Sequence, residues 1–506
     1  MPRRNLPDCL NPNSPAAPWR VPLDENDLAV RLETDGVTET VARLDFGFDG
    51  TLAMASQYYP ECAVASETLP AAKPAPSQWR EHLKGTVFAL PLALCSFCML
   101  VFNFSLWGGD LSAGMAAAIA LGTVASFVMT GGLVQAMAWQ GLFYAGSADF
   151  RMTLVTCRRW CTYGVAILAG TSVAAAIGNA SFRMLETPLL ATMLAFYVLL
   201  GLMWLSSGIL YMLEEHLRVS AAVALGLAVV VLLRWPLGLP LVSSQIGGLV
   251  CADITAFFLA WRCLKARAGH EPSRKHPQMV GRTLYFSAPY LVYGVCYYLL
   301  IFIDRVLAWT AQTESAVTPV IFRGDYELPL DIALIGFIAI VGWVHSSMVA
   351  FYARVQLEQP RITAAEAGKF NFAMQAFYLW RVIYFLPVAY LVCMILWIAA
   401  VQAGFLATPL TQRIAMIALL GYPWLALGLW NVSLLFALSI PSAVVLPVVA
   451  AVLADGATGY VLSRVLSYDW AVVGFLIGTV VFGTGSGLAV HRRFRRLDYF
   501  YFVSGA

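Results

Sequence analysis

The sequence predicts an all-α polytopic membrane protein with about twelve transmembrane helices in two six-helix bundles. Of its 506 residues, 60% are hydrophobic and only 12% are charged, whereas soluble proteins carry roughly 45–50% apolar and about 25% charged residues. Twelve apolar runs are long enough to cross a hydrocarbon core of about 30 Å, which takes about 20 helical residues. Lys and Arg also divide unevenly between the connections on the two sides.

The predicted spans follow one another along the chain with short connections. They cover residues 86–107, 113–144, 160–179, 187–213, 218–237, 243–264, 283–310, 329–354, 374–401, 412–437, 441–463 and 469–490. The least clear boundary is the break between the tenth and eleventh spans, at "LSIPSAVV".

Lys and Arg predict the orientation. If the N-terminus is cytosolic, the outside connections hold only Arg183, Arg234, Arg323, Arg413 and Arg464. The inside connections hold Arg151, Arg158, Arg159, Arg218, Arg262, Lys265, Arg267, Arg274, Lys275, Arg282, Arg354, Arg361, Lys369, Arg492, Arg493, Arg495 and Arg496. Because cytoplasmic loops carry the excess of Lys and Arg, both termini are predicted to be cytosolic.

The densest basic connection, residues 266–282, divides the chain. It separates a first six-helix bundle, 86–265, from a second, 283–490, as in transporters built from two parallel repeats. A cytosolic tail follows at 491–506. Residues 1–85 hold no apolar run of signal-peptide length, and ten of the 25 prolines precede residue 77. We expect a mostly extended cytosolic arm, in which "DENDLAVRLETDGVTETVARLD" forms one short amphipathic helix.

Several function classes lack their signatures. The net charge of +3 and the absence of basic–aromatic blocks argue against nucleic acid. There is no GxxxxGK[ST] loop and no HExxH motif, so we predict neither an enzyme nor a bound cofactor or metal. The ten cysteines are scattered, and several of them lie inside apolar runs, which indicates packing rather than redox chemistry.

Two ionisable residues lie deep in predicted spans and are candidates for proton coupling. Asp253 is near the middle of the sixth span, and His345 is well inside the eighth. Ionisable residues at such depth are costly and mark functional sites by default. The structural alternatives are a protonated Asp253 bonded to a neighbouring helix, and a neutral His345 bonded to a backbone carbonyl.

The seventh span combines tyrosines with a terminal charge pair. Asp304 lies about 30 Å along this helix, near its outer end, and Arg305, being adjacent, points about 100° away from it. One stripe of the helix carries Phe286, Tyr290, Tyr293, Tyr297 and Asp304. Aromatic faces and hydroxyls suit sugar rings, so Tyr290, Tyr293, Tyr297, Asp304 and Arg305 are predicted to bind substrate. The alternative is an aromatic packing seam with an interface anchor.

Several stretches resemble one known family, the Pel exopolysaccharide inner-membrane transporters of the multidrug/oligosaccharidyl-lipid/polysaccharide (MOP) flippase superfamily. "GVCYYLLIFIDRVLAW" is similar to the seventh span of that family, with Asp304 at the acid and Arg305 in place of a lysine. "YELPLDIALIGFIAIVGWVHSSMVAFYARVQLEQ" resembles the eighth span and its cytoplasmic-side motif, where Arg354 and Glu358 match and Gln356 replaces an acid. "MTGGLVQ", "LSSGILYMLEEHLR" and "HRRFRRLDYFYFV" extend the resemblance over about 85–503.

The resemblance implies a twelve-helix carrier in the bacterial inner membrane. It would move a galactosamine-rich polymer to the periplasm beside a cytosolic glycosyltransferase and other inner-membrane subunits. Three alternatives stay open: a flippase for lipid-linked oligosaccharide, a membrane-embedded glycan ligase or acyltransferase built on Asp304, Arg305 and Arg323, and a non-transporting assembly subunit.

Overall fold

The computed structural model describes residues 24–34, 36–67, 77–147, 149–269, 280–311, 320–358 and 367–503. Contacts within the chain define two compact units. The first comprises residues 1–76, 350–376 and 496–498, and the second comprises 77–349, 377–495 and 499–506. Each unit is described by itself.

The N-terminal segment is helical where it is described, so the expectation of a mostly extended arm is corrected for residues 24–67. It forms α1 (Glu25–Thr34), α2 (Glu39–Asp45) and α3 (Thr51–Glu67). Leu28, Leu32 and Met54 are at most 1% exposed and share one small core. The predicted single amphipathic helix is two helices, because Gly36 adopts a positive φ of 90° between them, a conformation that favours glycine.

The transmembrane prediction is confirmed. The first half contains α4 (Gln78–Val87), α5 (Leu90–Phe102), α6 (Ala113–Gly146), α7 (Phe150–Phe182), α8 (Thr187–Met212), α9 (His216–Arg234) and α10 (Leu241–Ala268). The second half contains α11 (Val280–Thr310), α12 (Gly324–Glu358), α13 (Ala367–Gln402), α14 (Pro409–Ala437), α15 (Ser442–Val465), α16 (Ala471–Phe494) and the short α17 (Leu497–Val503). Within the described residues, eleven helices are long and apolar enough to span a membrane. The pair α4 and α5, bent by 64°, makes a twelfth span if the two helices cross as one.

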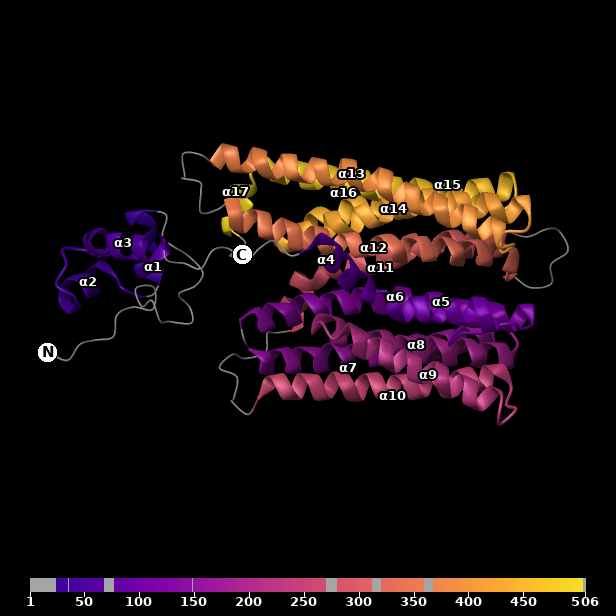
Figure 1. Cartoon of the computed structure of the whole chain (residues 1–506). Helices are drawn as coiled ribbons and strands as arrows, with labels where there is room; N and C mark the ends of the chain where they lie inside the picture. The colour runs from indigo at the N-terminus through magenta and orange to yellow at the C-terminus, as the bar shows by residue number, and fades with distance from the viewer. Residues whose placement is uncertain are drawn as a thin grey trace. The chain divides into compact units, whose positions relative to one another are not determined.

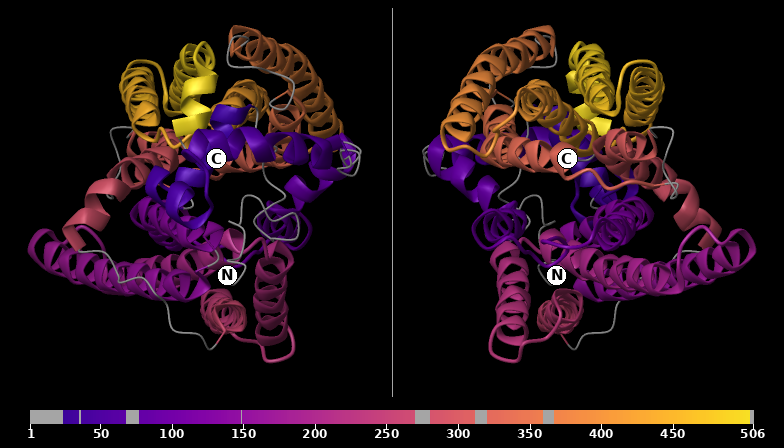
Figure 2. Two further views of the ribbon diagram at one scale, coloured as in Figure 1. Left: turned by 90° about the vertical axis from the view of Figure 1, so that its left-hand side faces the viewer. Right: turned by 90° about the vertical axis from the view of Figure 1, so that its right-hand side faces the viewer.

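The helices of each half pack mainly on one another. In the first half α6 packs against α8, and α9 against α10; in the second half α16 packs against α14 and α15. Figures 1 and 2 show α5–α10 and α12–α16 as two groups. α11 joins the halves, because it packs against α6 on one side and α15 on the other.

The contact between α6 and α11 is made by backbone. A Cβ atom placed on Gly294 of α11 would lie 2.4 Å from the carbonyl oxygen of Gly131, and one on Gly132 would lie 2.6 Å from the carbonyl oxygen of Leu291. Small residues allow such close approach between membrane helices, where packing rather than hydrophobicity drives association. The three glycines therefore set the distance between the two halves at this crossing.

The glycine crossing generates a first prediction. Gly294→Ala should lower the free energy of unfolding by about 1–3 kcal/mol, because overpacking forces the helices apart. Gly170→Ala is the matched control: a Cβ there meets nothing within 4 Å, and alanine is the better helix former. Thermal unfolding of the two purified variants in detergent measures the difference. Equal melting temperatures would show that the crossing does not limit stability.

Candidate functional site

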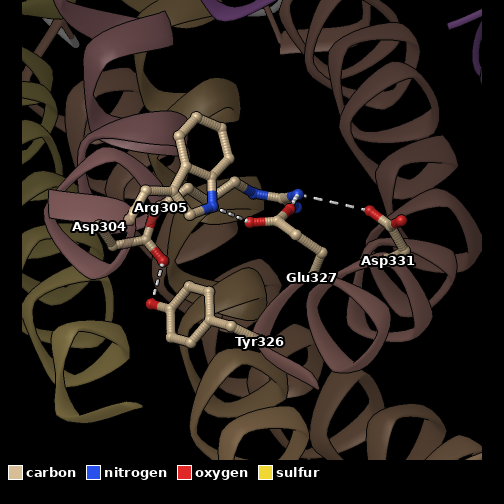
Figure 3. A network of polar contacts seen from close by, with 6 residues as sticks. Asp304, Arg305, Tyr326, Glu327 and Asp331 are labelled. Carbon is tan, nitrogen blue, oxygen red and sulfur yellow. Dashed lines mark hydrogen bonds and ion pairs between the residues drawn. The ribbon is translucent and has the colours of Figure 1, made fainter. Parts of the chain in front are cut away.

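The candidate site is a cluster of charged side chains at the C-terminal end of α11 (Figure 3). The sequence predicts that this end of the helix lies on the outer side of the membrane. Arg305, 8% exposed, pairs with Glu327 of α12, which is equally buried. Arg305 Nη1 also lies 3.4 Å from Asp331 Oδ1, one turn further along α12. A guanidinium in so apolar a setting requires such partners, because desolvation costs several kcal/mol per ion. The Arg305–Glu327 pair therefore ties α11 to α12.

Asp304 points away from Arg305, as adjacent helical residues must (Figure 3). Its Oδ2 accepts a hydrogen bond of 2.8 Å from the Tyr326 hydroxyl, while its Oδ1 has no hydrogen-bond partner among the described residues. Trp309, the unlabelled indole of Figure 3, donates from Nε1 to Glu327 Oε1 at 2.8 Å. Each carboxylate of the cluster thus keeps acceptor capacity available for a further cation or donor.

A further acid, Asp455 of α15, lies next to this cluster. Its side chain is fully buried, and neither carboxylate oxygen has a hydrogen-bond partner in the described part of the chain. A Cβ atom on Gly474 of α16 would lie 2.7 Å from Asp455 Oδ1, so the glycine makes room for the carboxylate. Asp455 and Asp304 are close enough to interact electrostatically. The sequence analysis missed Asp455, although an acid well inside the apolar run 441–463 was the signal that could have found it.

Aromatic rings continue from the charged cluster along α11 and form what we call the aromatic seam. It comprises Phe127 and Trp139 of α6, Trp204 of α8, Tyr290, Tyr293, Tyr297, Tyr298 and Phe302 of α11, and Phe436 of α14. From Tyr290 to Phe302 the seam follows α11 for about 18 Å. It ends where the Arg305 guanidinium lies 5.8 Å from the Phe302 ring centroid.

The predicted tyrosine face is enclosed by protein. Tyr290 and Tyr293 are each 2% exposed. The Tyr290 ring stacks on Trp139 with centroids 4.8 Å apart, and Tyr293 meets Phe436 edge-on at 5.3 Å. Tyr297 is half-buried against Tyr293 and Tyr298. The rings therefore face neighbouring helices from both halves, rather than acyl chains.

Asp253, the first candidate for proton coupling, is remote in sequence from the cluster, on α10. It is 6% exposed, and both its oxygens lack a hydrogen-bond partner among the described residues. The expected bond to a neighbouring helix is thus not made by any described group. A carboxyl group so placed requires a proton, water or an ion.

His345, the second candidate, contacts an acid that the sequence analysis did not consider. Its Nε2 lies 3.2 Å from Glu81 Oε2, and Glu81 also pairs with Lys84 at 2.6 Å. His345 therefore contacts a side chain of α4, rather than the backbone carbonyl of the structural alternative. α4 lies directly on α12 here, since a Cβ on Gly342 would be 2.3 Å from the His82 carbonyl oxygen.

Arg354 and Glu358 form a pair of their own. Arg354 Nη2 lies 2.6 Å from Glu358 Oε1, one helical turn along α12. Arg323, which the ligase alternative requires, donates instead to the carbonyl oxygens of Ala308 and Ala311 and stacks on Tyr468. The structure therefore brings Asp304, Arg305 and the tyrosines together along α11, and gives Arg323 a capping role at the end of that helix.

No family model and no curated protein matches the chain. Solved structures do match it over most of its length. An outward-facing multidrug resistance MATE family transporter of the MOP superfamily shows 17% identity and a TM-score of 0.58, covering 85% of this chain and 98% of that one. A MOP superfamily transporter from Pyrococcus furiosus shows 16% identity and a TM-score of 0.57, covering 83% and 96%. The chain therefore has the fold of MOP-superfamily transporters.

The buried ion pair generates a second prediction. Glu327→Ala should lower the free energy of unfolding by about 3–5 kcal/mol, because it leaves the Arg305 guanidinium buried without its main partner. Asp331→Asn, at a side chain that is 42% exposed, should cost less than about 1 kcal/mol. Thermal unfolding in detergent separates the two. A Glu327→Ala protein as stable as Asp331→Asn would contradict the assignment.

Proposed function

We propose that this protein is a transporter that moves an exopolysaccharide, of the Pel-like galactosamine-rich class, from the cytoplasm to the periplasm. The fold of MOP-superfamily transporters supports a carrier with two helical halves, and the resemblance in sequence supports the polymer. The aromatic seam is the observation that carries the proposal. It lies where the two halves meet, as the substrate path of an alternating-access carrier does.

The chemistry of the seam fits a saccharide. Flat ring faces offer apolar surface to the C–H faces of sugars, while tyrosine hydroxyls donate and accept hydrogen bonds at the rim. In this structure Trp139 covers the ring of Tyr290, and Phe436 covers the ring of Tyr293. Separation of α6 from α11 at their glycine crossing would uncover the stacked rings of Trp139 on α6 and Tyr290 on α11 for a passing chain.

The charged cluster fits the amino groups of a galactosamine-rich polymer. It holds four carboxyl groups, those of Asp304, Glu327, Asp331 and Asp455, against the single guanidinium of Arg305. The surplus of carboxyl groups offers hydrogen-bond acceptors to ammonium groups at the end of the path. Asp304, Asp455 and Asp253, whose carboxyl groups include oxygens with no hydrogen-bond partner among the described residues, are the groups that we expect to take up and release protons during transport. The glycosyltransferase and the other inner-membrane subunits are proposed partners.

The cluster gives a third prediction. Asp304→Asn and Asp455→Asn should each reduce polymer secretion by tenfold or more, in line with about 1.4 kcal/mol per tenfold change, because each removes a titratable carboxyl group and keeps the side-chain shape. The measurement is secreted polymer from cells with equal amounts of folded protein in the membrane. Asp469→Asn is the control, since Asp469 pairs with Arg413 at a connection predicted to be outside. Unchanged secretion by both variants would contradict the site.

The seam gives a fourth prediction. Tyr298→Leu should reduce secretion several-fold, because it removes a ring that links Tyr297 to Phe127 across the halves, and such contacts contribute about 0.5–1.5 kcal/mol each. Phe258→Leu is the matched control, since Phe258 is 60% exposed. Equal secretion by the two variants would mean that the seam serves only packing.

Reconstitution distinguishes the proposed function from the flippase alternative. Purified protein in liposomes, assayed once with polymer and once with lipid-linked oligosaccharide, should move the polymer alone. Movement of the lipid-linked oligosaccharide alone would favour the alternative.

A further inference from the structure

A groove on the first half lies away from the candidate site. It has a volume of about 470 Å³ and lies between α7 and α10, with Ile209 of α8 among its lining residues. On α7 its lining extends from Cys157 to Ala169, which is about 18 Å along the helix axis. That length is close to the depth of one leaflet, about half of the 30 Å hydrocarbon core. The groove therefore has the dimensions of a site for an acyl chain.

α7 is the helix most open to the bilayer. Only 6% of its most apolar 18-residue segment is buried within the protein. The surrounding lipid therefore has access to the groove from the side. Most of the lining is apolar or small, and includes Val165, Ala166 and Phe257. Volumes of roughly 300–1,000 Å³ with such linings are typical of small-ligand sites.

Basic side chains stand at one end of the groove. Arg158 is part of its lining and is exposed, and it forms no ion pair with any residue for which the structure gives a position. Trp261 lines the same end, and Lys265 Nζ lies 5.3 Å from the Trp261 ring centroid. Tryptophan and basic residues are typical of the headgroup level of a membrane. In the predicted orientation this end faces the cytoplasmic leaflet, which carries anionic lipids.

We propose that this groove binds an anionic phospholipid of the cytoplasmic leaflet. One acyl chain occupies the apolar part between α7 and α10. The phosphate lies between Arg158 and Lys265, and Trp261 packs against the glycerol region. The apolar length below the charges distinguishes this ligand from free phosphate, which would use the basic end alone. Basic sites between transmembrane helices on the cytoplasmic side bind lipid headgroups in this way.

The test is lipid binding by the purified, delipidated full-length protein. Native mass spectrometry in detergent measures the affinity for dioleoyl phosphatidylglycerol, with dioleoyl phosphatidylcholine and sodium phosphate as comparison ligands. Arg158→Gln and Lys265→Gln should each weaken phosphatidylglycerol binding about fivefold, and the double variant about 25-fold, as expected for the removal of basic residues near a headgroup. Arg159→Gln is the control of equal charge, because Arg159 donates to the Tyr163 hydroxyl at 2.8 Å and is not among the lining residues.

The apolar part of the groove is tested by a variant that keeps every charge. Ala166→Trp should abolish preferential binding of phosphatidylglycerol by filling the groove. Ala174→Trp, at an exposed position two turns further along α7, should leave it unchanged. Equal affinity for phosphatidylglycerol and phosphatidylcholine, full binding by the double variant, or competition by sodium phosphate at the lipid's own concentration would each overturn the proposal. None of these readouts depends on transport.

Discussion

The ion pair between Arg305 and Glu327 is the interaction on which the candidate site depends. Inside an apolar bundle neither charge is tolerated alone, so the C-terminal end of α11 must stay beside α12. This constraint fixes the neighbours of the pair as well. With Arg305 held toward α12, the adjacent Asp304 turns toward Tyr326, and Trp309, one turn further along α11, reaches Glu327.

α11 is held in a different manner on its other side. At the crossing with α6, three glycines bring the two backbones into contact, and the side chains of Tyr298 and Val295 pack against Gly131 and Gly132. Packing of this kind is lost abruptly on separation, since dispersion falls off within an ångström of contact. The helix is thus joined to its own half by the Arg305–Glu327 ion pair and by packing against α15, and to the opposite half by close backbone contact. The aromatic seam runs along the helix from the glycine crossing toward the ion pair.

The sequence predicted the transmembrane helices well because length and apolarity decide them locally. It also placed the tyrosines and Asp304 on one stripe of α11, since helical spacing is a local property. The partners were beyond its reach. Glu327 and Tyr326 come from the next helix, and only tertiary packing brings them to Arg305 and Asp304. Asp455 differs from these partners, because its signal is local: like Asp253, it is an acid inside an apolar run and was predictable from the sequence alone.

The N-terminal segment shows the opposite error, in which composition outweighed pattern. Prolines on both sides suggested an extended chain, yet Leu28, Leu32, Met54 and their neighbours supply enough apolar surface for a small core. That core precedes the first of the spans described above, so α1–α3 leave the ribosome before those spans do. Domains generally fold as units, beginning with the N-terminal one during synthesis. A unit that is already folded resists threading through a translocation channel, and its early folding reinforces the topology that the Lys and Arg count predicts.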